Sequence, residues 1–214
     1  MIFFENIFNA GVKVQPIKDA DGMAVYRMQE AKYSASYVDL KIDDGMVVSC
    51  DSNLKYDSVF SSCYGMRKCN DYLVVNNCTD CVEVFSIELK SHCNDFDRAK
   101  RQIQAGIALL AFCHRSRLDQ NKAFPANGIK YYGGVLTNTV IERGSTDPAI
   151  QDARLKVRRF LTSRPGVICV NGHDITLERL RTECEVVHLE DGIRNLFSAF
   201  PVRPLPDCFR QCGA

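Results

Sequence analysis

The stretch from Cys69 to Lys90, CNDYLVVNNCTDCVEVFSIELK, decides the fold. Two apolar runs of strand type flank Thr79-Asp80, which suits a two-residue turn between antiparallel strands. A hairpin centred on this turn places Asp71 opposite Glu88, with facing Cβ atoms roughly 4.5–5.5 Å apart. We therefore predict a hairpin that brings two carboxylates together at its open end.

Alternation along the second strand supports the same interpretation. Side chains two positions apart share a face of a strand, so Glu88 and Lys90 point one way while Ile87 and Leu89 point the other way, into a core. Two close carboxylates repel each other unless a cation lies between them. Mg²⁺ takes one or two carboxylates and keeps waters for a phosphate substrate, and a lysine beside a metal-bound water can orient or deprotonate it. The pattern indicates a metal-dependent phosphodiesterase site.

Asp71, the Glu88-Leu89-Lys90 triplet seventeen positions later and a following helical segment resemble the PD-(D/E)xK nuclease superfamily. That superfamily includes many restriction endonucleases, recombination nucleases and antiviral nucleases. The resemblance covers roughly residues 25–140. Asn70 stands where the name of the family has proline, a common variation.

The resemblance implies an α/β protein with a restriction-endonuclease-like core, in which helices flank a central mixed β-sheet. It implies that Asp71 and Glu88 hold Mg²⁺ or Mn²⁺, helped by the backbone carbonyl of Leu89, and that Lys90 positions or activates the attacking water. Two further residues match the family less closely. They are Glu30, an acidic residue in the helix-like segment 26–32, which would hold a second metal or order the first, and Gln102, in the helix after the lysine, which would orient the site.

The activity implied is hydrolysis of nucleic-acid phosphodiester bonds by an endonuclease or exonuclease, with DNA as the expected substrate. Defence against foreign DNA and DNA processing are both open, and a protein partner or a homodimer is expected. One alternative is a catalytically silent nuclease-like subunit for binding or scaffolding. Another is a zinc-stabilised interaction module built on Cys78 and Cys81. Simpler roles also remain for the residues themselves: a solvated strand face for Glu88 and Lys90, and exposed helix positions for Glu30 and Gln102.

Length and composition set broad limits. The 214 residues suit one domain, with the nuclease-like core at 25–140 and an extension at 141–214. The net charge of +1 gives no general field for nucleic acid, and no apolar run approaches a membrane span. The start of the chain lacks the pattern of a secretory signal, so we expect a soluble, cytoplasmic protein whose eleven cysteines are mainly reduced thiols.

Positive charge is clustered locally in two segments. Such clusters can neutralise phosphates, although a solvated helix face is the common alternative. The residues expected to contact a nucleic-acid backbone are Lys100, Arg101, Arg154, Lys156, Arg158 and Arg159.

The rest of the chain is interpreted coarsely from periodicity and turn residues. The expected elements are a helix over 23–37, a hairpin over 38–50 that turns at Asp43-Asp44-Gly45, a helix from Asp95 to about Arg117, a strand over 131–139, a helix over 147–163, a strand over 166–171 and a helix over 175–185.

Overall fold

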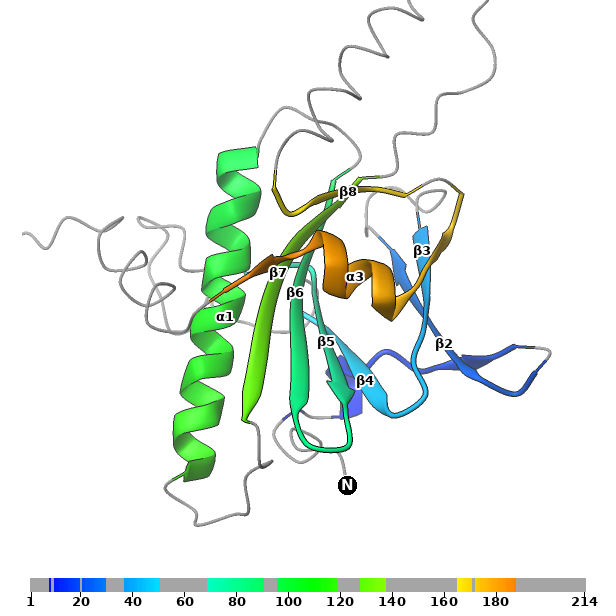
Figure 1. Cartoon of the computed structure of the whole chain (residues 1–214), viewed down its shortest axis with the longest axis horizontal. Helices are drawn as coiled ribbons and strands as arrows, with labels where there is room; N and C mark the ends of the chain where they lie inside the picture. Colours follow the sequence, from blue (N-terminus) through cyan, green and yellow to red (C-terminus); the bar gives the residue numbers. More distant parts are fainter. Residues whose placement is uncertain are drawn as a thin grey trace, which may run out of the picture.

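The computed structural model describes residues 8, 10–19, 21–29, 37–50, 69–90, 96–118, 128–137, 165–170 and 172–187. These residues form an α/β fold with two mixed β-sheets, two α-helices and a short 3₁₀ helix (Figure 1). The first sheet has six strands, which are β10 (Glu185–Val186), β7 (Ile129–Thr137), β6 (Val82–Lys90), β5 (Tyr72–Asn77) and β4 (Gly45–Ser49) in spatial order, with β8 (Val167–Cys169) also beside β7. The second sheet has four strands, which are β1 (Ile17–Lys18), β2 (Ala24–Gln29), β3 (Tyr37–Lys41) and β9 (Asp174–Ile175). The helices are η1 (Ala10–Val12), α1 (Phe96–Leu118) and α3 (Leu177–Glu183).

The predicted central hairpin is confirmed in its register. Strands β5 and β6 pair antiparallel from Tyr72 opposite Ile87 to Asn77 opposite Val82. The backbone N–H of Cys78 then donates to the carbonyl of Cys81 over 2.9 Å, which closes the turn around the two intervening residues. The same register, carried one residue beyond the first pair, sets Asp71 opposite Glu88.

A crossover helix joins β6 to β7, and the two strands pair in parallel along their whole lengths. Strand β8 also runs parallel to β7. The carboxyl ends of these three parallel strands therefore meet at one edge of the sheet. Strand β5 runs the opposite way, so its first residue lies at that edge too, where ligands commonly bind in α/β sheets.

The two faces of the six-stranded sheet are covered by different elements. On one face Val84 and Val135 pack in the apolar clusters that include α1. On the other face Phe85 packs in a cluster with Met28 of the second sheet and Leu180 of α3. Figure 1 shows α1 running alongside β7, with α3 across β6 and the second sheet beyond β4. Glu88 and Val84 are an even number of positions apart on β6, so their side chains lie on the same face of the strand. Glu88 therefore lies on the face that α1 covers.

The helix expected over 23–37 is wrong. Residues 24–29 form strand β2, and β3 begins at Tyr37. The alternation explains the result, because Tyr26 and Met28 are buried between the sheets while Arg27 is exposed and forms an ion pair with Asp39 of β3. Burial of every second side chain is typical of a strand, whereas the sequence pattern had been interpreted as a helix.

The hairpin expected over 38–50 is also wrong, although its turn is present. Strand β3 belongs to the second sheet and β4 to the first, so the Asp43-Asp44 bend leads from one sheet to the other. Gly45 allows the crossing, because a Cβ there would lie 2.2 Å from the carbonyl oxygen of Val75. The chain can approach β5 so closely only without a side chain.

Four other described elements match the sequence predictions within one or two residues at most ends, whereas η1, β1, β9 and β10 were not predicted, and β9 and β10 occupy the two ends of the helix expected over 175–185. Helix α1, strands β7 and β8 and helix α3 all lie where they were expected, and Thr176 caps α3 by accepting a hydrogen bond from the Arg179 N–H. The helix expected over 147–163 lies outside the described residues, as does most of the extension at 141–214. In the part of the chain that the structure describes, no helix has both the length and the apolarity to cross a membrane.

Candidate active site

Asp71 and Glu88 are held together by hydrogen bonds in both directions. The backbone N–H of Asp71 donates to Oε2 of Glu88 over 3.2 Å. The backbone N–H of Leu89 donates to Oδ2 of Asp71 over 2.7 Å. Each carboxylate is thus oriented by the backbone of the opposite strand, which follows directly from the hairpin register. The two acids predicted from the sequence are brought together.

Lys90 completes this group. Its Nζ lies 2.5 Å from Oε1 of Glu88, and its side chain is 23% exposed, whereas the side chain of Glu88 is fully buried. The lysine therefore reaches from the end of β6 towards solvent while it contacts a buried carboxylate. A solvated strand face, the simpler alternative, does not describe a carboxylate with no exposed surface.

The environment of Glu88 disfavours its charged form. Burial raises the pKa of Glu88 to about 8, and the Asp71 carboxylate adds to the increase, although the hydrogen bond and charge of Lys90 act in the opposite direction. One lysine thus does not offset both burial and a second carboxylate. A further positive charge at this site would therefore stabilise the ionised form of Glu88.

A divalent cation suits these donors. Carboxylate oxygens are the ligands that Mg²⁺ and Mn²⁺ prefer, and a cation would relieve the repulsion that acts on Glu88. Within the described ranges, no group of three or more His, Cys, Asp or Glu side chains is arranged as metal ligands. Asp71 and Glu88 would therefore share the metal with backbone, water or substrate oxygens, as Mg²⁺ sites commonly do.

Leu89 has two separate roles in the observed geometry. Its backbone N–H orients Asp71, and its side chain is buried in the core on the face away from Glu88. The use of its carbonyl oxygen as a metal ligand stays a prediction.

Gln102 points from α1 towards the sheet, not into solvent. It is 8% exposed, and its Nε2 donates to the carbonyl of Cys69, two residues before Asp71, over 3.2 Å. Its Oε1 is buried and has no hydrogen-bond partner. An exposed helix position, the simpler alternative for Gln102, is therefore excluded. The residue lies where it can orient the segment that leads into Asp71.

The segment before Asp71 is packed closely against α1. Asn70 is fully buried and donates a hydrogen bond to the carbonyl of Tyr72. Ser86 donates to the carbonyl of Ile103 in α1 over 3.1 Å. A Cβ on Gly106 would lie 2.0 Å from Oδ1 of Asn70, so only glycine allows this approach. Asn70 thus helps to fix the start of β5.

Glu30 lies outside the described residues, and the helix expected to carry it is replaced by β2 as far as Gln29. Its neighbour Gln29 is tied to the hairpin, because the hydroxyl of Tyr72 accepts from the Gln29 N–H over 2.9 Å and donates to the Gln29 carbonyl over 2.7 Å. The end of β2 therefore lies against the residue that follows Asp71. The role of Glu30 stays a prediction.

The expected phosphate-binding residues are only partly described. Lys100 and Arg101 are exposed on α1, and Nζ of Lys100 lies 3.9 Å from a carboxylate oxygen of Glu185. The second cluster lies outside the described residues and comprises Arg154, Lys156, Arg158 and Arg159.

Thr137 was missed by the sequence interpretation. It is the last residue of β7 and pairs with Lys90 in the parallel register. It is 1% exposed, and its hydroxyl has no hydrogen-bond partner. The available signal was its place at the carboxyl end of a strand that follows a crossover helix, but a threonine in a strand is too common for that signal to be used alone.

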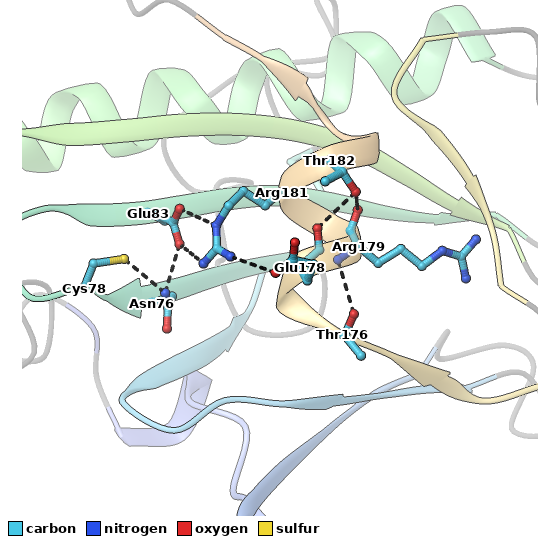
Figure 2. Close-up of polar contacts among 8 residues, drawn as sticks. All are labelled: Asn76, Cys78, Glu83, Thr176, Glu178, Arg179, Arg181 and Thr182. Carbon is cyan, nitrogen blue, oxygen red and sulfur yellow. Dashed lines mark hydrogen bonds and ion pairs between the residues drawn. The ribbon is translucent and has the colours of Figure 1, made fainter.

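A second charged group lies on the opposite face of the sheet. Figure 2 shows Arg181 of α3 directed at Glu83 of β6, and the two nitrogen–oxygen distances are 2.7 and 2.8 Å. Asn76 donates to the same carboxylate over 2.9 Å and contacts the sulfur of Cys78 over 3.4 Å. Burial alone would raise the pKa of Glu83, but the hydrogen bonds from Arg181 and Asn76 outweigh it and lower that pKa. This group fastens α3 to the sheet.

The cysteines of the hairpin do not gather around one point. Cys78 and Cys81 face each other at the turn, while Cys69 precedes the start of β5 at the other end of the hairpin. All three have free thiols. A four-cysteine zinc site that included Cys69 would require the observed hairpin to break, which argues against the zinc module.

Comparison with known proteins adds nothing to this geometry, since no protein-family model, no curated protein and no solved structure matches the chain.

Proposed function

We propose that this protein is a divalent-metal-dependent nuclease that hydrolyses nucleic-acid phosphodiester bonds, with DNA as the expected substrate. The observation that carries the proposal is the contact of Asp71, Glu88 and Lys90 at one edge of the sheet, with Glu88 fully buried. Buried ionisable groups with strongly shifted pKa values are typical of functional sites.

The order of elements supports the same proposal. A strand pair that carries Asp71 and Glu88 is followed by a helix that carries Gln102 and by a parallel strand, as the resemblance to PD-(D/E)xK nucleases implies. The upstream helix of that pattern has no counterpart in residues 24–29. The proposal therefore depends on the hairpin, α1 and β7, and not on the segment before them.

In this proposal the residues divide the work of phosphodiester hydrolysis. Asp71 and Glu88 hold the metal, which when bound supplies positive charge to the phosphate and lowers the pKa of a coordinated water. Lys90 has three N–H donors and directs one of them at Glu88, so the others can orient an attacking water or a phosphate oxygen. Gln102 holds the chain before Asp71 in place through the Cys69 carbonyl.

Cleavage assays on wild type, Lys90→Ala and Lys18→Ala test the proposal, with supercoiled and linear DNA in Mg²⁺, Mn²⁺ or EDTA. Lys18 is an exposed lysine on β1 and serves as the matched control. We expect cleavage by wild type and Lys18→Ala, a loss of roughly 10²–10⁴-fold in Lys90→Ala, and no cleavage in EDTA. Cleavage that survives both Lys90→Ala and EDTA would exclude this site.

A catalytically silent binding subunit is the second candidate. It is favoured by the short contact of Lys90 with Glu88, because a lysine that neutralises the carboxylate can replace a metal instead of assisting one. Manganese titration separates the two functions. A nuclease should bind Mn²⁺ and lose that binding in Asp71→Asn and Glu88→Gln, whereas a silent subunit should bind little Mn²⁺ in any of the three proteins.

A further inference from the structure

Two buried polar atoms near the candidate active site have no hydrogen-bond partner. They are Oε1 of Gln102 and Oγ1 of Thr137, in side chains that are 8% and 1% exposed. Buried polar groups are paired in most proteins, and leaving one unpaired costs free energy. Gln102 still makes one hydrogen bond, through its Nε2, but the Thr137 hydroxyl makes none. Unpaired groups of this kind are expected where a ligand supplies the missing partner.

The position of Thr137 is set by the sheet. It pairs with Lys90 at the carboxyl ends of the adjacent parallel strands β6 and β7. Val135 lies two positions earlier and packs in the apolar cluster with α1, so Thr137 lies on the same face as Val135. Glu88 pairs with Val135 in the same register. The Thr137 hydroxyl, Lys90 and Glu88 therefore share one face at one edge of the sheet.

The charges near the Thr137 hydroxyl indicate which kind of group would accept its hydrogen bond. A threonine hydroxyl can donate one hydrogen bond, and the neighbouring Lys90 ammonium has donors beyond the one directed at Glu88. An anionic oxygen placed between the two side chains would accept from both. Hydrogen bonds to an ionised acceptor are also the stronger kind.

We propose that the hydroxyl of Thr137 donates a hydrogen bond to a non-bridging oxygen of the phosphate that is cleaved, which makes Thr137 a substrate-contacting residue. This proposal rests on the proposed nuclease function and deepens it. In this arrangement the end of β7 forms the side of the site opposite Asp71. The phosphate lies between the carboxylates of the hairpin and the hydroxyl of Thr137.

The test compares wild type with Thr137→Val, which removes the hydroxyl at nearly constant shape, and with Thr137→Ser, which keeps it. We expect kcat/KM for DNA cleavage to fall roughly tenfold or more in Thr137→Val and to change by less than about threefold in Thr137→Ser. Thr182→Val is the matched control, because the Thr182 hydroxyl bonds to the Glu178 carbonyl on exposed α3 and should not affect cleavage.

A sulfur-substituted substrate separates contact with the phosphate from a structural effect. Sulfur is a poor hydrogen-bond acceptor, so replacing the contacted oxygen should slow the wild type and slow Thr137→Val less. We expect this difference for one of the two phosphorothioate diastereomers. A merely structural role for Thr137 would give the same sulfur effect in both proteins for each diastereomer, and that result would overturn the proposal.

Thermal unfolding without metal gives an independent readout. An unpaired hydroxyl costs stability, so Thr137→Val should melt at a higher temperature than wild type while it cleaves more slowly. A lower melting temperature together with slower cleavage would show that the hydroxyl serves the fold, and the proposal would fail. If the wild type cleaves DNA and Thr137→Val has the same kcat/KM, the proposed Thr137 contact is excluded while the nuclease function is kept. If the wild type neither cleaves DNA nor binds Mn²⁺, both the proposed nuclease function and the proposed Thr137 contact are excluded.

Discussion

The backbone N–H of Asp71 donates to the side chain of Glu88, and in return the Asp71 carboxylate accepts from the N–H that follows Glu88 in the chain. The two acids are thus held by main-chain groups on paired strands and not by flexible side chains alone. Removing either carboxylate takes the acceptor from a partly buried N–H. The two carboxylates are therefore coupled through the backbone, and we expect a change at one to alter the position of the other.

Glu88→Gln should change the pH dependence of stability. The raised pKa of Glu88, about 8, means that the folded protein holds a proton which the unfolded chain loses near its ordinary value of 4.5. Stability from this group is fully present below that ordinary value and is lost as pH rises towards about 8. We expect the free energy of unfolding of the metal-free wild type to fall by on the order of 5 kcal/mol across this window, because the pKa rises from 4.5 to about 8 and each pKa unit corresponds to about 1.4 kcal/mol.

Urea unfolding of wild type and Glu88→Gln at several pH values between 4.5 and 9 measures the difference between them. The variant should show a flatter profile, because an amide does not titrate, and should equal or exceed wild-type stability at pH 9. Parallel profiles for the two proteins would contradict the assignment of this pH dependence to Glu88.

Gly106→Ala should damage the segment that leads into Asp71. The added Cβ would lie 2.0 Å from Oδ1 of Asn70 and 2.7 Å from Oγ of Ser86, both in buried residues. We expect a loss of about 1–3 kcal/mol in the free energy of unfolding, together with slower cleavage. Gly11→Ala is the control, since a Cβ there meets nothing within 4 Å. Equal stability of the two variants in urea unfolding would contradict the close packing of α1 on Asn70.

Arg181→Met should weaken the attachment of α3 to the sheet. The change leaves Glu83, whose side chain is 4% exposed, without its main cationic partner. We expect a loss of about 2–3 kcal/mol in the free energy of unfolding. Arg179→Met should cost less, about 1 kcal/mol, because its carboxylate partner Glu183 is 40% exposed and its other contact is a single hydrogen bond to the Cys169 carbonyl. The double variant Arg181→Met with Glu83→Gln should recover part of the loss, and a failure to recover any would argue against an unpaired carboxylate as the cause.

Tyr72→Phe should loosen the contact between the two sheets. Its hydroxyl bonds both the N–H and the carbonyl of Gln29, so the change removes two hydrogen bonds at once. We expect a loss of about 1–3 kcal/mol in stability, measured by urea unfolding. Tyr132→Phe is the matched control, because the Tyr132 hydroxyl makes no hydrogen bond to any of the described residues and its ring stacks on Phe85 in either case. Faster hydrogen exchange at the end of β2 in Tyr72→Phe alone would place the effect at this contact.

The hairpin register could be predicted because the evidence for it is local. The turn, the alternation of Glu88 and Lys90 and the apolar runs all lie within the segment from Cys69 to Lys90, so no distant partner was needed. Helix α1 was predictable for the same reason, since its apolar spacing is internal. The segment 24–29 was not, because its side chains also fit a helix, and only burial against β3 and the first sheet favours a strand.

The sequence by itself determined the hairpin, and with it the approach of Asp71 to Glu88 and the direction of Lys90, because pairing across a two-residue turn depends on neighbours in the chain. Only the tertiary structure decided the rest of the site. The parallel pairing of β6 with β7 brings Thr137 beside Lys90, and the packing of α1 turns Gln102 towards Cys69. Those contacts join segments 33 or more residues apart, and they depend on the burial of the faces between them, which no local pattern records.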